Sequence, residues 1–158
     1  METKVRMADH SDIERLIKSR FDYFDAENWE VTIDKRAVIE SNLKEYFIKH
    51  LNEDFFAAIV EVNDKIASIA FLAISEKPAN LSFPTGKTGT VFNVLTYPEH
   101  RKKGCATHTM KALIEEAKKQ SLSYVELSAS EAGKPLYEKL GFQEKKVSHF
   151  IEMKLSLL

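Results

Sequence analysis

Three consecutive cations, Arg101, Lys102 and Lys103, stand immediately before Gly104 and a segment with helical periodicity. A helix N-terminus carries about half a unit of positive charge, so each cation there is unfavourable by roughly 0.3–1 kcal/mol. The arrangement becomes favourable when an anion binds at that end. Gly104 and Ala106 have little side-chain bulk, which lets phosphate oxygens approach the backbone amides. The pattern predicts a phosphate site, although a solvated basic corner explains the cations alone about as well.

Other binding motifs do not account for this loop. The sequence has neither the G-x-x-x-x-G-K-[ST] nor the G-x-G-x-x-G phosphate motif. The histidines show no HxxxH or HExxH spacing, and a single cysteine cannot supply a zinc cluster, so we expect no metal. That cysteine, Cys105, has little support as a nucleophile because no base is identifiable beside it.

The loop follows a predicted strand, residues 90–96, and precedes a predicted helix from Gly104 to Gln120. Residues 122–128 predict another strand, which completes a strand–helix–strand unit. The crossover places the start of the helix at the carboxyl end of the first strand. Open sheets of this kind usually bind ligands there.

The remaining elements surround this unit. Asp9 and Asp34 are candidate N-caps of two amphipathic helices, and Asn63-Asp64 separates two β-rich runs as in a hairpin. Other predicted elements are a strand at residues 4–8, a short helix at 134–140 stopped by Gly141, and final strands at 142–147 and 149–155. We expect an α/β (α+β) fold in one domain, residues 1–158. Its mixed, mostly antiparallel sheet of six to seven strands carries a central βαβ unit and helices on both faces.

The bulk composition limits the classes of partner and compartment. The chain has 158 residues, 44% of them hydrophobic and 30% charged, with a formal net charge of −1. This charge gives no reason to expect nucleic-acid or anionic-membrane binding. One cysteine rules out an internal disulfide and suits a reducing compartment. The longest apolar run, residues 66–74, is about half the length needed to cross a bilayer. We therefore expect a cytoplasmic protein outside the membrane.

The segment Arg101-Lys-Lys-Gly104-Cys-Ala106 resembles the Q/R-x-x-G-x-G/A loop of the GNAT superfamily of N-acetyltransferases. VRMADHSDIERL resembles the opening strand and first helix of that family. YPEHRKKGCATHTMKALIEEAKK resembles its central loop and helix, and PLYEKLGF its late helix. The three motifs stand in family order over most of the chain. The resemblance implies a GNAT-like fold that transfers an acetyl group from acetyl-CoA to a primary amine within a ternary complex.

The resemblance also implies roles for individual residues. The pantetheine arm pairs with the backbone of residues 94–96, and a backbone N–H near Leu95 stabilises the oxyanion. Tyr137 acts as the general acid that protonates the departing sulfur, and it contacts the cofactor. Ser130 occupies a place where the family often has Asn. The full set of cofactor-binding residues is Val94, Leu95, Thr96, Arg101, Lys102, Lys103, Gly104, Cys105, Ala106, Thr107, Ser130 and Tyr137.

The general base stays open. Glu126 shares a strand face with Tyr124 and Ser128, and a carboxylate in a β-rich run is costly to bury unless it is paired. Glu61 and Glu131 are alternative candidates for the general base. A salt bridge at the edge of the sheet explains any of these three carboxylates more simply. In the resembled family, water also acts without a dedicated side-chain base.

The acceptor is a further hypothesis. In the resembled family the first two helices and their link form one wall of the acceptor site, and here that stretch holds Asp22, Asp25, Glu27 and Glu30. This charge favours a small cationic amine such as a polyamine, although a solvated acidic link is the simpler interpretation. The partners are then acetyl-CoA and an amine, and a homodimer is compatible with the sequence. Two alternatives are a catalytically silent acyl-CoA sensor and an acetyltransferase acting on protein N-termini or lysines.

Overall fold

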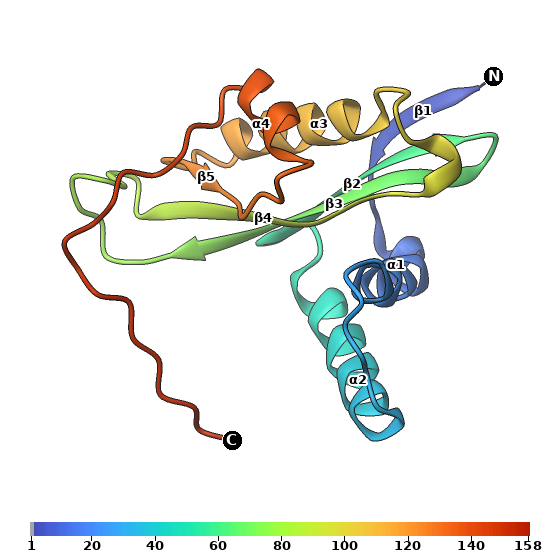
Figure 1. Ribbon diagram of the computed structural model, residues 1–158, viewed down its shortest axis with the longest axis horizontal. Helices are drawn as coiled ribbons and strands as arrows, with labels where there is room; N and C mark the ends of the chain where they lie inside the picture. Colours follow the sequence, from blue (N-terminus) through green and yellow to red (C-terminus); the bar gives the residue numbers. More distant parts are fainter. Residues whose placement is uncertain (1) are drawn as a thin grey trace. The chain divides into compact units, whose positions relative to one another are not determined.

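The computed structural model describes residues 2–158, in two compact units, Met1–Ser128 and Ala129–Leu158. The first unit contains a five-stranded sheet in the order β1-β2-β3-β4-β5 (Figure 1). All neighbouring strands are antiparallel except β4 and β5, which are parallel. The strands are β1 (Thr3–Met7), β2 (Phe55–Val62), β3 (Lys65–Glu76), β4 (Lys87–Thr96) and β5 (Val125–Glu126).

Helices cover both faces of this sheet. Helix α3 (Cys105–Lys119) lies on one face, against β1 to β4, whereas α1 (Ile13–Ala26) and α2 (Ile33–His50) lie on the other (Figure 1). Two short 3-10 turns, η1 (His10–Asp12) and η2 (Pro98–His100), precede α1 and follow β4. Helix α4 (Lys134–Lys139) belongs to the second unit. Among residues 2–158, no helix combines the length and the apolar character needed to cross a bilayer.

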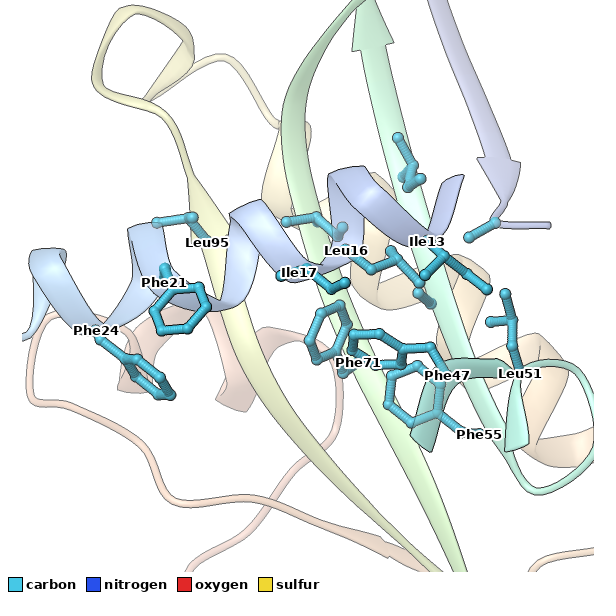
Figure 2. Packing of buried hydrophobic residues seen from close by; sticks show 14 residues of the cluster. Ile13, Leu16, Ile17, Phe21, Phe24, Phe47, Leu51, Phe55, Phe71 and Leu95 are labelled. Atoms are coloured by element: carbon cyan, nitrogen blue, oxygen red, sulfur yellow. The ribbon is translucent and has the colours of Figure 1, made fainter. Parts of the chain in front are cut away.

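The strand alternation sends side chains to two separate core layers. On the α1 and α2 face, the apolar side of α1 packs toward a group of phenylalanines that includes Phe47, Phe55 and Phe71 (Figure 2). On the α3 face, Cys105 packs with Val60, Val62 and Ala67 and is only 5% exposed. Cys105 therefore serves as a small core residue, which gives its thiol no access to a substrate.

Local signals in the sequence place most element boundaries. Asp9 and Asp12 form the expected capping box, with both reciprocal hydrogen bonds present. The hairpin turn at Asn63 and Asp64 has φ values of 51° and 64°, as the residue types predicted. The cap of α2 is Thr32, whose hydroxyl accepts from the Lys35 amide, so the prediction of Asp34 was wrong by two residues.

The predicted count of six to seven strands was wrong. Residues 2–158 form five strands, and β5 contains two residues rather than seven. The segments 142–147 and 149–155 form no strand, and apart from the half-buried Phe142 their apolar side chains lie in solvent, with Ile151 85% and Met153 90% exposed. Alternating apolar residues favour an extended chain, but a strand also requires a neighbour for its backbone groups. The structure provides no such neighbour within the described residues.

Candidate active site

The start of α3 presents the amides that the sequence assigned to an anion. Gly104 is the N-cap residue, with φ 80°, and no side chain caps this end of the helix within residues 2–158. The first helical bond runs from the His108 amide to the Gly104 carbonyl, at 3.2 Å. The amides of the first turn, residues 105–107, come before that bond and point out of the helix end. A Cβ added at Gly104 would meet nothing within 4 Å, so the approach to these amides is open.

Two of the three cations fix the loop in place. The Arg101 Nε donates to the Thr96 carbonyl at 3.0 Å, and the Lys103 Nζ donates to the Glu99 carbonyl at 3.1 Å. Lys102 has φ 59°, a left-handed conformation that is unusual for a residue with a side chain. The residues 101–104 are all exposed, so the positive charge stays at the surface beside the helix start. Binding of an anion by this loop remains a prediction.

The edge of β4 is open beside this loop. Strand β5 pairs only with Gly89 and Thr90, and beyond Thr90 no other strand of residues 2–158 lies on that side of β4. Glycine is needed at position 89 because a Cβ there would lie 2.7 Å from Leu72 Cδ1 and 2.8 Å from Leu122 Cδ1. The two parallel strands meet closely at this point and pair no further, which leaves the later part of β4 accessible to an amide-containing ligand.

The register of β4 decides which of its amides face that open edge. The Tyr97 amide donates to the Ala67 carbonyl at 3.0 Å, and antiparallel pairs alternate, so the backbone groups of Leu95 also face β3. Thr96 faces the other way, as its bond from Arg101 indicates. The Leu95 amide therefore faces β3, whereas the Val94 amide lies outside the β3 ladder. The predicted oxyanion donor near Leu95 remains a prediction.

A bulge in β4 contains a residue that the sequence reasoning missed. The register between β3 and β4 shifts between Ile69 and Phe71, so one residue of β3 faces both Asn93 and Val94. Asn93 has φ 54° and is 1% exposed. Its side-chain Nδ2 is buried and has no hydrogen-bond partner in the described chain. Strain and an unsatisfied buried amide together mark a functional position.

Arg20, on α1, lies against this bulge and was also missed. Its guanidinium donates to Asn93 Oδ1 at 3.4 Å and lies over the rings of Phe24 and Phe92, at 4.7 and 5.2 Å. Burial lowers the pKa of Arg20, although a guanidinium remains charged at neutral pH. Both residues had a signal in the sequence. Asn interrupts the β-rich run TVFNVLT, and Arg20 is one helical turn from Phe24 on the apolar side of α1.

Of the carboxylates considered as general base, Glu61 is engaged elsewhere. Its Oε1 accepts from Arg6 Nη2 at 2.6 Å and from Arg6 Nε at 2.9 Å. Arg6 also holds Asp12 with two bonds, at 2.7 and 2.8 Å. This ion-pair network joins β1, β2 and the start of α1, and Glu61 is one of its members. Glu126 lies in β5, opposite Thr90, and Glu131 belongs to the second unit.

The predicted acid and one predicted cofactor contact lie in the second unit. Tyr137 is half-buried on α4 and packs edge-to-face on Phe142, with ring centroids 6.0 Å apart. The Ser130 hydroxyl accepts from the Gly133 amide at 3.1 Å, so it shapes the turn before α4. Pro135 stands in the first turn of α4, where its missing N–H costs nothing. The roles of Tyr137 and Ser130 remain predictions.

The acidic link comprises the last turns of α1 and the residues that follow the helix, and its charge is partly neutralised. Asp22 Oδ2 accepts from Lys18 Nζ at 2.7 Å and from the Tyr97 hydroxyl at 2.6 Å. Burial and the neighbouring Asp22 raise the pKa of Tyr97, so that hydroxyl stays protonated as a donor. Asp25 and Glu30 instead line an open hollow together with Trp29. The acidic charge that the link presents to an acceptor therefore lies in its later part.

The geometry therefore consists of an uncapped helix start, an open strand edge and a bulged residue between them. Residues 14–142 match the model of the acetyltransferase (GNAT) family, and the chain belongs to that family. Membership confirms the resemblance seen in the sequence and makes acetyl-CoA the cosubstrate of this chain. Among residues 2–158, no three His, Cys, Asp or Glu side chains are grouped as a metal site requires.

Solved structures agree with this assignment. A predicted acetyltransferase from Clostridium acetobutylicum, crystallised with acetyl-CoA, is 32% identical over 97% of this chain and 96% of its own, with a TM-score of 0.83. A GCN5-related N-acetyltransferase from Ralstonia eutropha shares the fold at 21% identity, covering 95% of this chain and 99% of its own, with a TM-score of 0.76. No curated protein matches the sequence.

Proposed function

We propose that this chain transfers an acetyl group from acetyl-CoA to the primary amine of a small molecule, within one ternary complex. The observation that carries the proposal is the open edge of β4 leading to the uncapped start of α3. The pantetheine amides pair with the outward backbone groups of Val94 and Thr96. The pyrophosphate binds the amides of residues 102–107, with Arg101, Lys102 and Lys103 adding positive charge.

The chemistry needs few groups. The amine nitrogen attacks the thioester carbon, the oxyanion accepts a hydrogen bond from the Val94 amide, and the carbon–sulfur bond then breaks. One such donor is typically worth about 3–4 kcal/mol in the transition state. Tyr137 donates its proton to the departing thiolate, which suits a phenol that is protonated at neutral pH. Water takes one proton from the ammonium to give the neutral amine before attack and a second from the nitrogen of the tetrahedral adduct. Tyr137 regains its proton from solvent after coenzyme A leaves.

The acceptor binds on the α1 side of the sheet, where the acidic link lies. Asp25 and Glu30 in the hollow beside Trp29 give a local negative potential, which attracts an amine in its ammonium form. The proposed acceptor is thus a small molecule that is cationic at the nitrogen to be acetylated. Salt should weaken this attraction.

The experiment combines calorimetry with acetyl-CoA and an amine screen that follows thiol release. Tyr137→Phe should lower turnover by about 10²- to 10⁴-fold while the acetyl-CoA Kd stays the same. Tyr46→Phe, a change at another half-buried tyrosine, on α2, is the matched control and should keep full turnover. Absence of acetyl-CoA binding contradicts the proposal. Binding without turnover on any amine identifies a silent sensor instead.

A further inference from the structure

Arg20 is a cation without an anion. Among residues 2–158 no carboxylate lies within ion-pair distance of its guanidinium, and its one hydrogen bond, to Asn93 Oδ1, is long at 3.4 Å. Burial lowers the pKa of Arg20, whereas the nearby Tyr23 raises it. A guanidinium has five N–H donors, and a cation taken out of water is costly unless it is paired. Most of these donors are available to a ligand.

The surrounding aromatic rings hold this guanidinium in place. It lies between the faces of Phe24 from α1 and Phe92 from β4, at distances typical of cation–π contacts. The side chain is only partly buried, so one side of it remains reachable from solvent. A guanidinium that is held by two aromatic rings and can still be reached from solvent is well suited to bind a carboxylate or a phosphoryl group.

Asn93 supplies a second, independent observation. Adjacent residues of a regular strand point to opposite faces, yet both Phe92 and Asn93 contact Arg20. The left-handed backbone at Asn93 produces this arrangement, at a cost of about 1–3 kcal/mol for a non-glycine residue. The side-chain oxygen must face the Arg20 donor, so the other amide atom is Nδ2. Nδ2 is buried without an acceptor, directly beside the guanidinium.

The position of this pair relates it to the reaction. Asn93 immediately precedes Val94, which the proposed function places at the thioester carbonyl. Helix α1, which carries Arg20, lies on the face of the sheet opposite α3 (Figure 1). A group bound by Arg20 therefore approaches the thioester from the side opposite the cofactor pyrophosphate, which is the side available to an acceptor.

We propose that Arg20 and the Asn93 amide bind an oxyanion of the acceptor, a carboxylate or a phosphoryl group carried by the same molecule as the amine. This inference rests on the proposed function and narrows its substrate class. Nδ2 is sealed from solvent in the free chain, so the bound oxygen must displace the atoms that cover it. With the ammonium attracted by Asp25 and Glu30, the acceptor is amphoteric rather than a polyamine.

The test uses pairs of primary amines that differ only in the anionic group. Common amino acids are each compared with their own carboxamides, and phosphoethanolamine with ethanolamine. The wild-type protein should favour the anionic member in kcat/KM by about 10- to 100-fold, the range of hydrogen bonds to charged groups. Arg20→Met, which keeps the aliphatic stem between the rings, should abolish that preference. The acetyl-CoA Kd should stay unchanged.

Two further variants make the result specific. Arg20→Lys keeps the positive charge but lacks the paired N–H donors of a guanidinium. This variant should retain part of the kcat/KM preference for the anionic amine. A purely structural role of Arg20 would produce no such partial preference. Arg15→Met removes an exposed charge from the same helix and should retain all of it. If Arg20→Met does not fold, the kcat/KM preferences of the wild type and of Arg20→Lys still test whether Arg20 binds an oxyanion. Equal kcat/KM for both members of every pair overturns the inference.

A binding readout separates this inference from the proposed function. The NMR signal of the Arg20 Nε–H is assigned by its absence from the spectrum of Arg20→Met. In a titration this signal should shift in a saturable way with the anionic amine, and it should not shift with the matching amine that lacks the anionic group. If no amine is acetylated but this resonance shifts, the proposed function fails and the oxyanion site stands. If amines are acetylated without preference and the resonance does not move, only the oxyanion site fails.

Discussion

Replacing Gly104 by alanine tests the phosphate loop most directly. Gly104 has φ 80°, and a Cβ at this position would meet no protein atom within 4 Å. Steric overlap therefore contributes nothing to the effect of the substitution. The cost comes from the left-handed backbone, which is unfavourable by about 1–2 kcal/mol for a residue with a Cβ. Alanine also lowers the conformational entropy of the unfolded chain, which stabilises the folded state by about 0.4–1 kcal/mol.

We expect Gly104→Ala to lower the free energy of unfolding by about 0.5–1 kcal/mol, the difference between these two contributions. The effect on the cofactor should be larger. The new methyl group occupies the open space above the amides of residues 105–107, and a loop that relaxes out of the left-handed region moves those amides. We expect the acetyl-CoA Kd to rise by about tenfold, which corresponds to 1.4 kcal/mol.

Gly141→Ala is the matched control. Gly141 has φ 101°, and a Cβ added there would also meet no protein atom within 4 Å, but this glycine follows α4 instead of preceding α3. Urea denaturation should show similar losses of stability in the two variants, and calorimetry should show weaker acetyl-CoA binding only in Gly104→Ala. An unchanged Kd in Gly104→Ala, or an equal rise in both variants, would refute the placement of the pyrophosphate at this helix start.

Two other predictions concern stability. Asp12→Asn breaks a charged pair with Arg6 and should cost about 1.5–3 kcal/mol at neutral pH, measured by denaturant unfolding. Arg6 holds the pKa of Asp12 below its ordinary value, so this contribution is present above about pH 4 and is lost as the pH falls through the folded-state pKa. The variant should accordingly lose less stability than the wild type on acidification, and an identical acid profile would contradict this assignment. Gly89→Ala places a methyl group 2.7 Å from Leu72 Cδ1. This substitution should lower the free energy of unfolding by about 1–3 kcal/mol. An unchanged midpoint of denaturant unfolding would show that the β4–β5 junction is loosely packed.

Short-range patterns in the sequence determined the family and much of the framework. The capping box at Asp9, the turn at Asn63 and the glycine start of α3 depend on residues within a few positions of one another. Such features are set by local hydrogen bonds and backbone freedom, so they can be read without the rest of the chain. The cation and glycine loop belongs to this class, so its place immediately before α3 could be predicted from the sequence alone.

Pairing between distant segments decides what local patterns in the sequence could not predict. Which β4 amides face the open edge depends on the pairing with β3, and a shift of one residue exchanges the two sets, so the choice of Leu95 or Val94 as oxyanion donor stays a prediction. Alternation alone predicted strands at residues 142–155, where no neighbouring strand pairs with them in the described structure.

The sequence by itself determined the family, the order of the elements as far as α4 and the glycine that begins α3. Only the tertiary structure decided that Glu61 is taken by Arg6, that the bulge turns Asn93 toward α1, and that Arg20 lies there without a carboxylate among the described residues. The physical reason is that the charge and hydrogen-bond state of a side chain depends on atoms brought together from remote parts of the chain. The proposed acceptor site depends on such contacts.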